Sequence, residues 1–264
     1  MNLLTILPNV LDLIRNVGEF QKKELTKVES RHIIEKDIHS LVSYVDIESE
    51  KLLVSGLQKL LPESDFITEE NTIHQTRSGK CTWIIDPLDG TTNYLNGIPV
   101  FSISVALLVN DELQLGIIYH VMMDEMFYAM KENGAFLNDK KIQVSQTSLL
   151  KDAVVATGFP YQVKNMKELS GILQHILNES RGVRRLGSAA IDLAYTSCGR
   201  FDAYYEAMIN PWDVAAGILL MTEAGGNVTD MNGAKDPLFA KNILACNSYL
   251  QEEMLGLILK VRAS

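Results

Sequence analysis

Apolar residues at helical spacing open the chain. They recur every three or four positions from Leu4 to about Leu25, and this period predicts an amphipathic helix with one buried face. A second helical pattern follows Asp46 and stops before Pro62, because proline does not continue a helix. Residues 71–80 are polar and rich in turn-forming types, so we expect a surface loop there.

The rest of the first half has the composition of β-strands. Two apolar runs flank Asn110 and Asp111, which predicts a β-hairpin with a tight turn. Further runs extend this hairpin into an antiparallel sheet, so we expect the N-terminal half, about residues 1–145, to be α+β. The four runs cover residues 101–109, 112–121, 125–130 and 134–142.

Strand and helix patterns alternate in the second half, about residues 146–264. This alternation favours a layered α/β arrangement with some parallel strands. No repeat, low-complexity tract or linker separates the halves, so residues 1–264 are expected to form a single domain. The predicted strands are 154–158, 183–186, 202–206 and 243–245, and the predicted helices are 164–178, 188–198, 213–224 and 248–261.

Composition narrows the class of protein. The chain is 47% hydrophobic and 22% charged, as soluble enzymes are. A net charge of −9 argues against binding to nucleic acid or to an anionic membrane surface. Cys81, Cys198 and Cys246 form no CxxC pair, so we expect buried thiols in a reducing compartment rather than a disulfide or a zinc site. We find no signal sequence and no membrane-spanning apolar run, which predicts a cytoplasmic protein.

Acidic residues follow short apolar runs at element boundaries. Asp86 and Asp89 end the run that begins at Trp83, Glu69 ends the run FITE, and Asp213 opens an Ala- and Gly-rich helical stretch. An Asp-Pro or Asp-Gly pair alone is a common turn former. Three such clusters at boundaries are hard to explain as turns, and carboxylates are the ligands that hard divalent cations prefer. The sequence therefore predicts a cation site.

The segments that carry these acids resemble the signature sequences of the inositol monophosphatase family, the Mg²⁺-dependent, lithium-sensitive phosphatases of inositol and sugar phosphates. They are FITEE, WIIDPLDGTTN, and PWDVAAG with TEAGG, in the order found in that family. The matches run from about Val42 to Gly226. The resemblance implies a mixed α+β and α/β fold, the layered αβαβα sandwich of inositol monophosphatases and fructose-1,6-bisphosphatases, and it implies a homodimer.

The resemblance also implies how the acids share the cations. Glu69, Asp86 and the Leu88 carbonyl would hold one Mg²⁺, while Asp86, Asp89 and Asp213 would hold a second. Only the convergence of acids is visible from the residues themselves.

The remaining site residues come from the same resemblance. Glu69 and Thr91, the latter paired with Asp46, would orient the attacking water. Judged alone, Asp46 is a helix cap and Glu206 a solvated residue at a strand end. Arg184 and Arg185 are expected to face solvent. The positions that match the family's substrate contacts are Gly90, Thr91, Gly187, Ser188, Ala189, Glu206 and Asp213.

The expected activity is hydrolysis of a small polyol phosphomonoester, such as an inositol phosphate, by in-line attack of water with two or three Mg²⁺ ions. Fructose-1,6-bisphosphatase and 3′-phosphoadenosine 5′-phosphate phosphatase activities on the same fold are alternatives, and the GTTN ending favours the inositol branch. A different class is a non-catalytic role in association with the transcription machinery. The sequence leaves the physiological substrate, the number of metals, the lithium sensitivity and the oligomer open.

Overall fold

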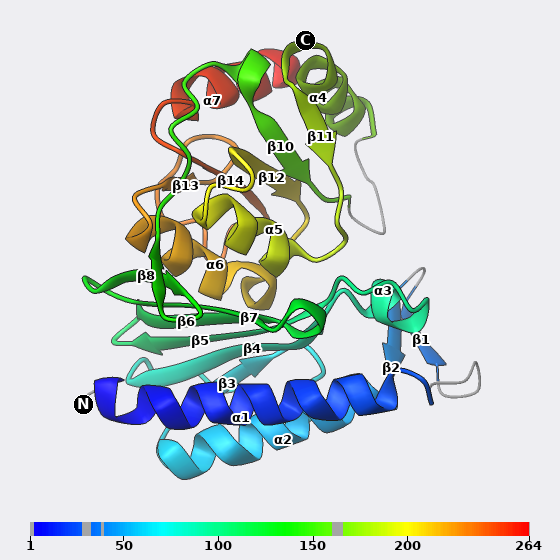
Figure 1. Ribbon diagram of the computed structural model, residues 1–264, viewed down its shortest axis with the longest axis vertical. Helices are drawn as coiled ribbons and strands as arrows, with labels where there is room; N and C mark the ends of the chain where they lie inside the picture. The colour runs from blue at the N-terminus through cyan, green and yellow to red at the C-terminus, as the bar shows by residue number, and fades with distance from the viewer. Residues whose placement is uncertain (1–2, 28–32, 38–39, 160–165, 264) are drawn as a thin grey trace.

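The computed structural model describes residues 3–27, 33–37, 40–159 and 166–263. Figure 1 shows their elements stacked in layers, with a helix pair outside each of two sheets and a third pair between the sheets. This confirms the expected αβαβα sandwich. The outer pairs are α1 (Leu3–Glu24) with α2 (Tyr44–Leu60), and α4 (Met166–Glu179) with α7 (Gln251–Arg262); the inner pair is α5 (Ala189–Ser197) with α6 (Pro211–Glu223).

The larger sheet has seven strands in the order β3-β4-β5-β6-β7-β8-β9. All neighbouring strands are antiparallel except β3 and β4, which are parallel. Asn110 and Asp111 have φ of 52° and 62°, as a tight hairpin turn requires. The predicted hairpin is confirmed. The strands are β3 (Asp65–Thr68), β4 (Cys81–Asp89), β5 (Ser102–Val109), β6 (Glu112–His120), β7 (Glu125–Met130), β8 (Gly134–Leu137) and β9 (Lys140–Ile142).

The smaller sheet has five strands in the order β11-β10-β12-β14-β13. Strands β11, β10 and β12 are parallel to one another, as the alternating pattern predicts, and β14 runs antiparallel to both of its neighbours, β12 and β13. A separate hairpin of β1 (Ile33–Asp37) and β2 (Ser40–Ser43) lies beside the short helix α3 (Thr91–Leu95). The five strands are β11 (Gly182–Arg184), β10 (Val154–Thr157), β12 (Ala203–Ala207), β14 (Asn242–Cys246) and β13 (Asn227–Thr229).

Several boundaries differ from the prediction for local reasons. Helix α6 begins at Pro211 rather than Asp213, because proline fits the first turn of a helix, where its missing N–H is not needed. Helix α7 begins three residues after Ser248. There the Asn247 carboxamide oxygen accepts the N–H groups of Tyr249 and Leu250, which holds a turn before the helix. The predicted start of α4 at 164 lies outside the described residues.

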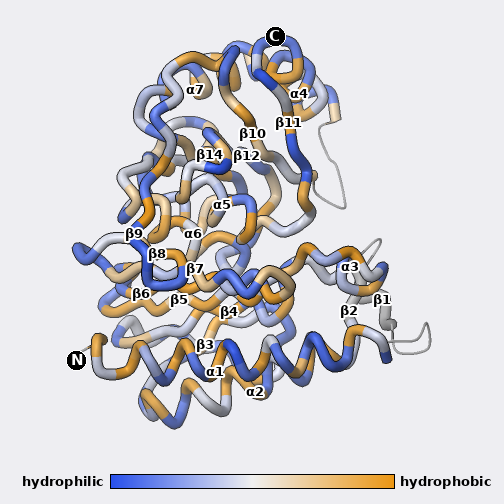
Figure 2. The backbone as a smooth tube through the Cα atoms, in the orientation of Figure 1, coloured by the Kyte–Doolittle hydropathy of each residue, from blue (hydrophilic) through white to orange (hydrophobic). Residues whose placement is uncertain are grey.

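Three apolar cores fill the spaces between layers. The central core joins residues of both sheets with α5 and α6, so the two halves of the chain share it. The outer cores lie under α1 with α2 and under α4 with α7. Hydrophobic and hydrophilic residues alternate along α1 (Figure 2), as an amphipathic helix requires. Organisation as a single domain stays a prediction, which the shared core supports.

The cysteines match the expectation only in part. Among the described residues all three are free thiols, but Cys246 alone is buried, while Cys81 and Cys198 are half-buried. Cys81 is the first residue of β4, where the sheet meets the surface. No helix in the described ranges has both the length and the apolar character needed to span a bilayer.

Close packing of α6 on the larger sheet makes a prediction. A Cβ added to Gly116 of β6 would lie 2.7 Å from the Ala216 carbonyl oxygen and 3.0 Å from its Cα. Since backbone cannot rotate aside, Gly116→Ala is expected to lower the free energy of unfolding by about 1–3 kcal/mol. Gly256 of α7 has no atom within 4 Å of an added Cβ, so Gly256→Ala should raise it by roughly 0.5–1 kcal/mol. Urea unfolding measures both changes in free energy. A Gly116→Ala variant that is as stable as wild type would contradict the close contact with the Ala216 backbone.

Candidate active site

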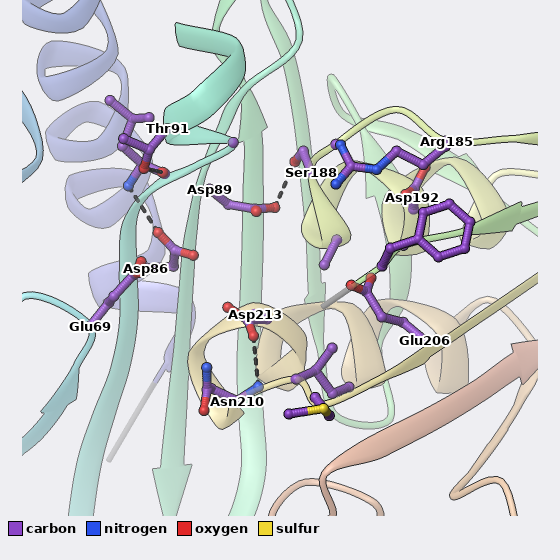
Figure 3. Close-up of a pocket in the computed structure, with 18 residues that line it drawn as sticks. Glu69, Asp86, Asp89, Thr91, Arg185, Ser188, Asp192, Glu206, Asn210 and Asp213 are labelled. Carbon is purple, nitrogen blue, oxygen red and sulfur yellow. Dashed lines mark hydrogen bonds between the residues drawn. The ribbon is translucent and has the colours of Figure 1, made fainter. Parts of the chain in front are cut away.

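One pocket collects the acids predicted from the sequence. It lies where β4 and β12 end and where α5 and α6 begin, and Figure 3 shows its residues from both halves of the chain. Every site residue predicted from the sequence lines it except Asp46, which contacts it through Thr91. The acidic residues of the pocket are Glu69, Asp86, Asp89, Asp192, Glu206 and Asp213.

A bulge at the end of β4 brings two acids to the same side. Residues three apart on a regular strand point to opposite faces. Here Asp86 pairs with Ser104 and Asp89 with Ser102, so three steps along β4 match two along β5. The extra residue restores the alternation, and Pro87 fits there because a bulge does not need its N–H. Both carboxylates therefore reach the pocket.

Gly90 makes the turn that follows. Its φ is 100°, and an added Cβ would lie 3.1 Å from the Val100 carbonyl oxygen and 3.2 Å from that of Gly187. Both the conformation and the close approach favour glycine. The turn starts α3 at Thr91, whose hydroxyl donates to Asp46 Oδ1 at 2.8 Å.

Asp46 has two roles. Its Oδ2 accepts the N–H of Ser43 at 2.9 Å and the hydroxyl at 2.7 Å, which caps α2. Its other oxygen accepts the Thr91 hydroxyl. Burial raises the pKa of Asp46, against the lowering effect of these hydrogen bonds. The sequence left two alternatives for Asp46, a helix cap or the partner of Thr91. In the structure this one carboxylate has both roles.

Glu50 holds the segment around Glu69. This fully buried carboxylate accepts the Thr68 hydroxyl at 3.0 Å and the N–H groups of Glu70 and Thr72 at 2.7 Å each. It therefore fixes the backbone on both sides of Glu69. Sequence reasoning missed Glu50, although its position one helical turn after Asp46 puts it on the same face of α2.

The start of α5 anchors Asp89. Oδ2 of this residue accepts the Ser188 hydroxyl at 2.6 Å and the Ala190 N–H at 2.7 Å (Figure 3). Ser188 is also the N-cap of α5, since its oxygen accepts the Ile191 N–H. Asp213 is fixed in a similar way, because its Oδ2 accepts the Asn210 N–H at 2.6 Å at the start of α6.

Burial and mutual repulsion disfavour ionisation of these acids. Burial raises the pKa of Asp86 well above its ordinary value, and the charges of Glu69, Asp89 and Asp213 raise it further. Burial likewise raises the pKa of Asp89 and, more strongly, that of Asp213. A bound cation would relieve this repulsion.

The donor set fits a hard cation. Only oxygen donors line the acidic side of the pocket, with no histidine or cysteine among its residues, and Mg²⁺ prefers oxygen ligands. Within the described ranges no three His, Cys, Asp or Glu side chains already form a closed ligand group. Instead Asp89 faces α5 and Asp213 faces Asn210, so the arrangement is open.

The opposite wall differs from the prediction. Glu206 is not a solvated residue, because burial raises its pKa to about 7 and Tyr204 donates a hydrogen bond to it at 2.5 Å. Its carboxylate lies over Gly158, where an added Cβ would come within 2.0 Å of Oε2. Arg185 is exposed but lines the pocket, which corrects the expectation for it, whereas Arg184 is exposed and does not line it.

Sequence reasoning also missed several lining residues. One signal was available, because the carboxyl ends of parallel strands meet at the same edge of a sheet. Strands β10 and β12 are such neighbours, so the residues after each belong to the site. The missed residues are Gly158, Phe159, Arg185, Asp192, Met208, Ile209 and Asn210.

The raised pKa of Glu206 predicts a pH-dependent effect on stability. A carboxyl group with a higher pKa in the folded than in the unfolded state loses its favourable contribution as pH rises, here from 4.5 to about 7. Glu206→Gln removes this titration. We therefore expect its gain in Tm over wild type, measured in chelator, to be larger at about pH 8.5 than at about pH 4.5. Equal gains would contradict the raised pKa.

The chain is similar to known proteins over most of its length. The model of the "Inositol monophosphatase family" matches residues 5–263. The chain is 36% identical over 244 residues to an inositol-1-monophosphatase of Mesorhizobium japonicum, covering 92% of each. It is 39% identical over 224 residues to the Nus factor SuhB of Xylella fastidiosa, covering 84% of this chain and 81% of the relative.

Solved structures show the same fold. The crystal structure of the extragenic suppressor protein suhB of Bartonella henselae superposes with a TM-score of 0.92 at 34% identity, covering 97% of this chain and 99% of the other. Fold and sequence are similar over nearly the whole chain. The chain therefore belongs to the inositol monophosphatase family.

Proposed function

We propose that the chain is a Mg²⁺-dependent phosphatase that uses water to hydrolyse a small polyol phosphomonoester. One observation carries the proposal: the buried Asp86 and the half-buried Glu69, Asp89 and Asp213, at the ends of β3 and β4 and the start of α6, face a wall that contains Glu206 across a single pocket. The acids would bind cations, and these cations would bind the phosphate group. The opposite wall would bind the hydroxyl groups of the substrate. Membership of the family supports phosphatase chemistry.

The proposed ligands of two Mg²⁺ ions are Glu69, Asp86, Asp89, Asp213 and the Leu88 carbonyl, all of which line the pocket. When bound, such ions neutralise phosphate charge and lower the pKa of water. The chain's own contribution is to hold these oxygens still. Glu50 fixes the segment of Glu69, and the start of α5 fixes Asp89.

Thr91 and Glu69 would orient the attacking water. Because the Thr91 hydroxyl donates its proton to Asp46, its oxygen is left to accept a hydrogen bond from water. Glu69, on the same side of the pocket, would accept the second proton. The water oxygen would then present a lone pair to the phosphorus. The backbone N–H groups of Gly90 and Thr91 would bind the phosphate.

The opposite wall would hold the alcohol part of the substrate. Glu206 and the turn of Gly187, Ser188 and Ala189 line the pocket beyond Asp89. A carboxylate is a hydrogen-bond acceptor suited to hydroxyl groups. Bisphosphatase and nucleotide phosphatase activities stay alternatives, and phosphate release from a panel of inositol, sugar and nucleotide phosphates separates them. Lithium inhibition, a homodimer and a cytoplasmic location stay predictions from the resemblance.

A binding role is a second candidate function, because the Xylella fastidiosa relative is named a Nus factor. The net charge of −9 disfavours direct contact with nucleic acid, so such a role would use a protein partner. Asp89→Asn separates the two functions. Capture of a transcription complex by both wild type and this variant, with no phosphate release by wild type, would favour the binding role.

Asp89→Asn is expected to keep the fold and remove turnover. The amide oxygen can still accept from Ser188 and Ala190, while the loss of the Asp89 charge relieves its repulsion of Asp86 and Asp213. Phosphate release should fall by roughly a hundredfold or more, and the Tm of the metal-free form should rise. Wild-type activity should disappear in excess chelator and return with Mg²⁺.

The control for this variant is Asp202→Asn. Asp202 is also a buried aspartate, but it accepts the Val154 N–H away from the pocket. The amide oxygen can still accept the Val154 N–H, so this replacement should leave turnover and the Mg²⁺ requirement unchanged. Near-normal turnover of Asp89→Asn at saturating Mg²⁺ would show that Asp89 only shapes the turn.

Glu206→Gln is expected to change specificity. Loss of a charged hydroxyl acceptor should lower kcat/KM for inositol or sugar phosphates by about ten- to a hundredfold. p-Nitrophenyl phosphate should be affected much less, because its leaving group has no hydroxyl. The ratio of the two kcat/KM values measures this. If both substrates fell together and the Mg²⁺ requirement rose, Glu206 would belong to the metal site instead.

A further inference from the structure

Asp192 is a buried acid whose role in the pocket is not explained by the cation site. It lies in the first turn of α5, four residues after the N-cap Ser188, so both side chains are on the same face of the helix. Its exposed fraction is 1%, yet it lines the pocket. Figure 3 shows it between Arg185 and Glu206, on the side away from Glu69 and Asp86.

One carboxylate oxygen of Asp192 has no hydrogen-bond partner within the described part of the chain. Other buried acids near the site are well paired, as Glu50 and Asp46 are. A buried carboxylate without partners destabilises the folded protein. The adjacent positions Ile191 and Leu193 are buried and apolar, so packing alone does not require an acid here.

The neighbouring charges indicate which ligand the carboxylate suits. Burial raises the pKa of Asp192 well above its ordinary value, the charges of Glu206 and Asp89 raise it further, and Arg185 lowers it. Because Arg185 already supplies positive charge to this wall, a cationic ligand is not required. A neutral hydroxyl group can donate to the carboxylate without adding charge.

We propose that Asp192 is a second hydroxyl-binding residue of the substrate pocket, beyond Glu206. The inference rests on the proposed phosphatase function and narrows its substrate class. The substrate would carry at least two hydroxyl groups on the part remote from phosphate, one bound by Glu206 and one by Asp192. A polyhydroxylated ring or chain meets this requirement, whereas a phosphate with a single hydroxyl leaves one carboxylate unpaired.

The test compares Asp192→Leu and Asp192→Asn with wild type. For inositol phosphate we expect kcat/KM of Asp192→Leu to fall by about ten- to a hundredfold, and for p-nitrophenyl phosphate by less than about threefold. The Tm of the ligand-free variant should not fall, because an unpaired carboxylate is removed. Asp192→Asn keeps the size of the side chain and one acceptor, so it should show a smaller loss with an intact fold.

Deoxy analogues of the substrate locate the contact. The loss caused by Asp192→Leu should disappear for the analogue that lacks the hydroxyl bound by Asp192. The loss caused by Glu206→Gln should disappear for a different analogue. Asp202→Leu is the control, because it removes a paired buried aspartate outside the pocket and should lower the Tm without changing the substrate ratio.

An unchanged substrate ratio in folded Asp192 variants would overturn the inference and leave the phosphatase proposal standing. A lower Tm with an equal loss on both substrates would overturn it too, since it indicates a structural role. Wild type that releases phosphate from neither substrate would end both proposals.

Discussion

Burial of β4 on both faces is the constraint on which the site depends. Trp83 and Ile85 pack into the core under α1 and α2, and Ile84 packs into the central core under α5 and α6. A strand held from both sides cannot shift its register without moving apolar residues out of two cores. The bulge at its end is therefore held in place. It presents Asp86 and Asp89 to a pocket that neither half of the chain forms alone.

The same burial makes the pocket unfavourable for charge. The acids of the site raise one another's pKa, and the packing around them excludes the water that would otherwise solvate them. Hydrogen bonds from the starts of helices offset part of the free-energy cost of burying these charges. Asp46 caps α2, Asp89 accepts from the start of α5, and Asp213 accepts at the start of α6. The site and the layers above and below it are therefore stabilised by the same bonds.

Period and turn chemistry predicted most of the elements, because these signals are local. The hairpin at Asn110 and the alternation after residue 146 are examples. Strand β13 was missed because its three residues are too short to show a period. The β1 and β2 hairpin was also missed, in a charged stretch of which residues 28–32 and 38–39 lie outside the described ranges.

The acids of the proposed cation site could be predicted because they lie in short sequence segments that resemble the signatures of the family. The opposite wall was predicted only in part, because the resemblance supplied Glu206 and residues 187–189 while the other members are defined by contacts across the fold. Gly158 belongs to the site because Glu206 lies over it, and Arg185 because its strand ends at the same edge of the sheet. Asp192 lies inside an apolar helical pattern, where a single acid gives no local indication of where it points.

The two sides of the site differ in how cleanly a mutation there can test function. Asp46, Asp89 and Asp213 each accept a helix-terminal hydrogen bond and also belong to the site, so a replacement that cannot accept this bond changes stability and activity together. Asp192 is not a cap residue of α5, and Glu206 lies near the end of strand β12. Their replacement leaves the caps intact, so an effect on substrate choice can be separated from an effect on folding. The wall opposite the cation site is for this reason the part of the site whose chemistry is most directly accessible to mutation.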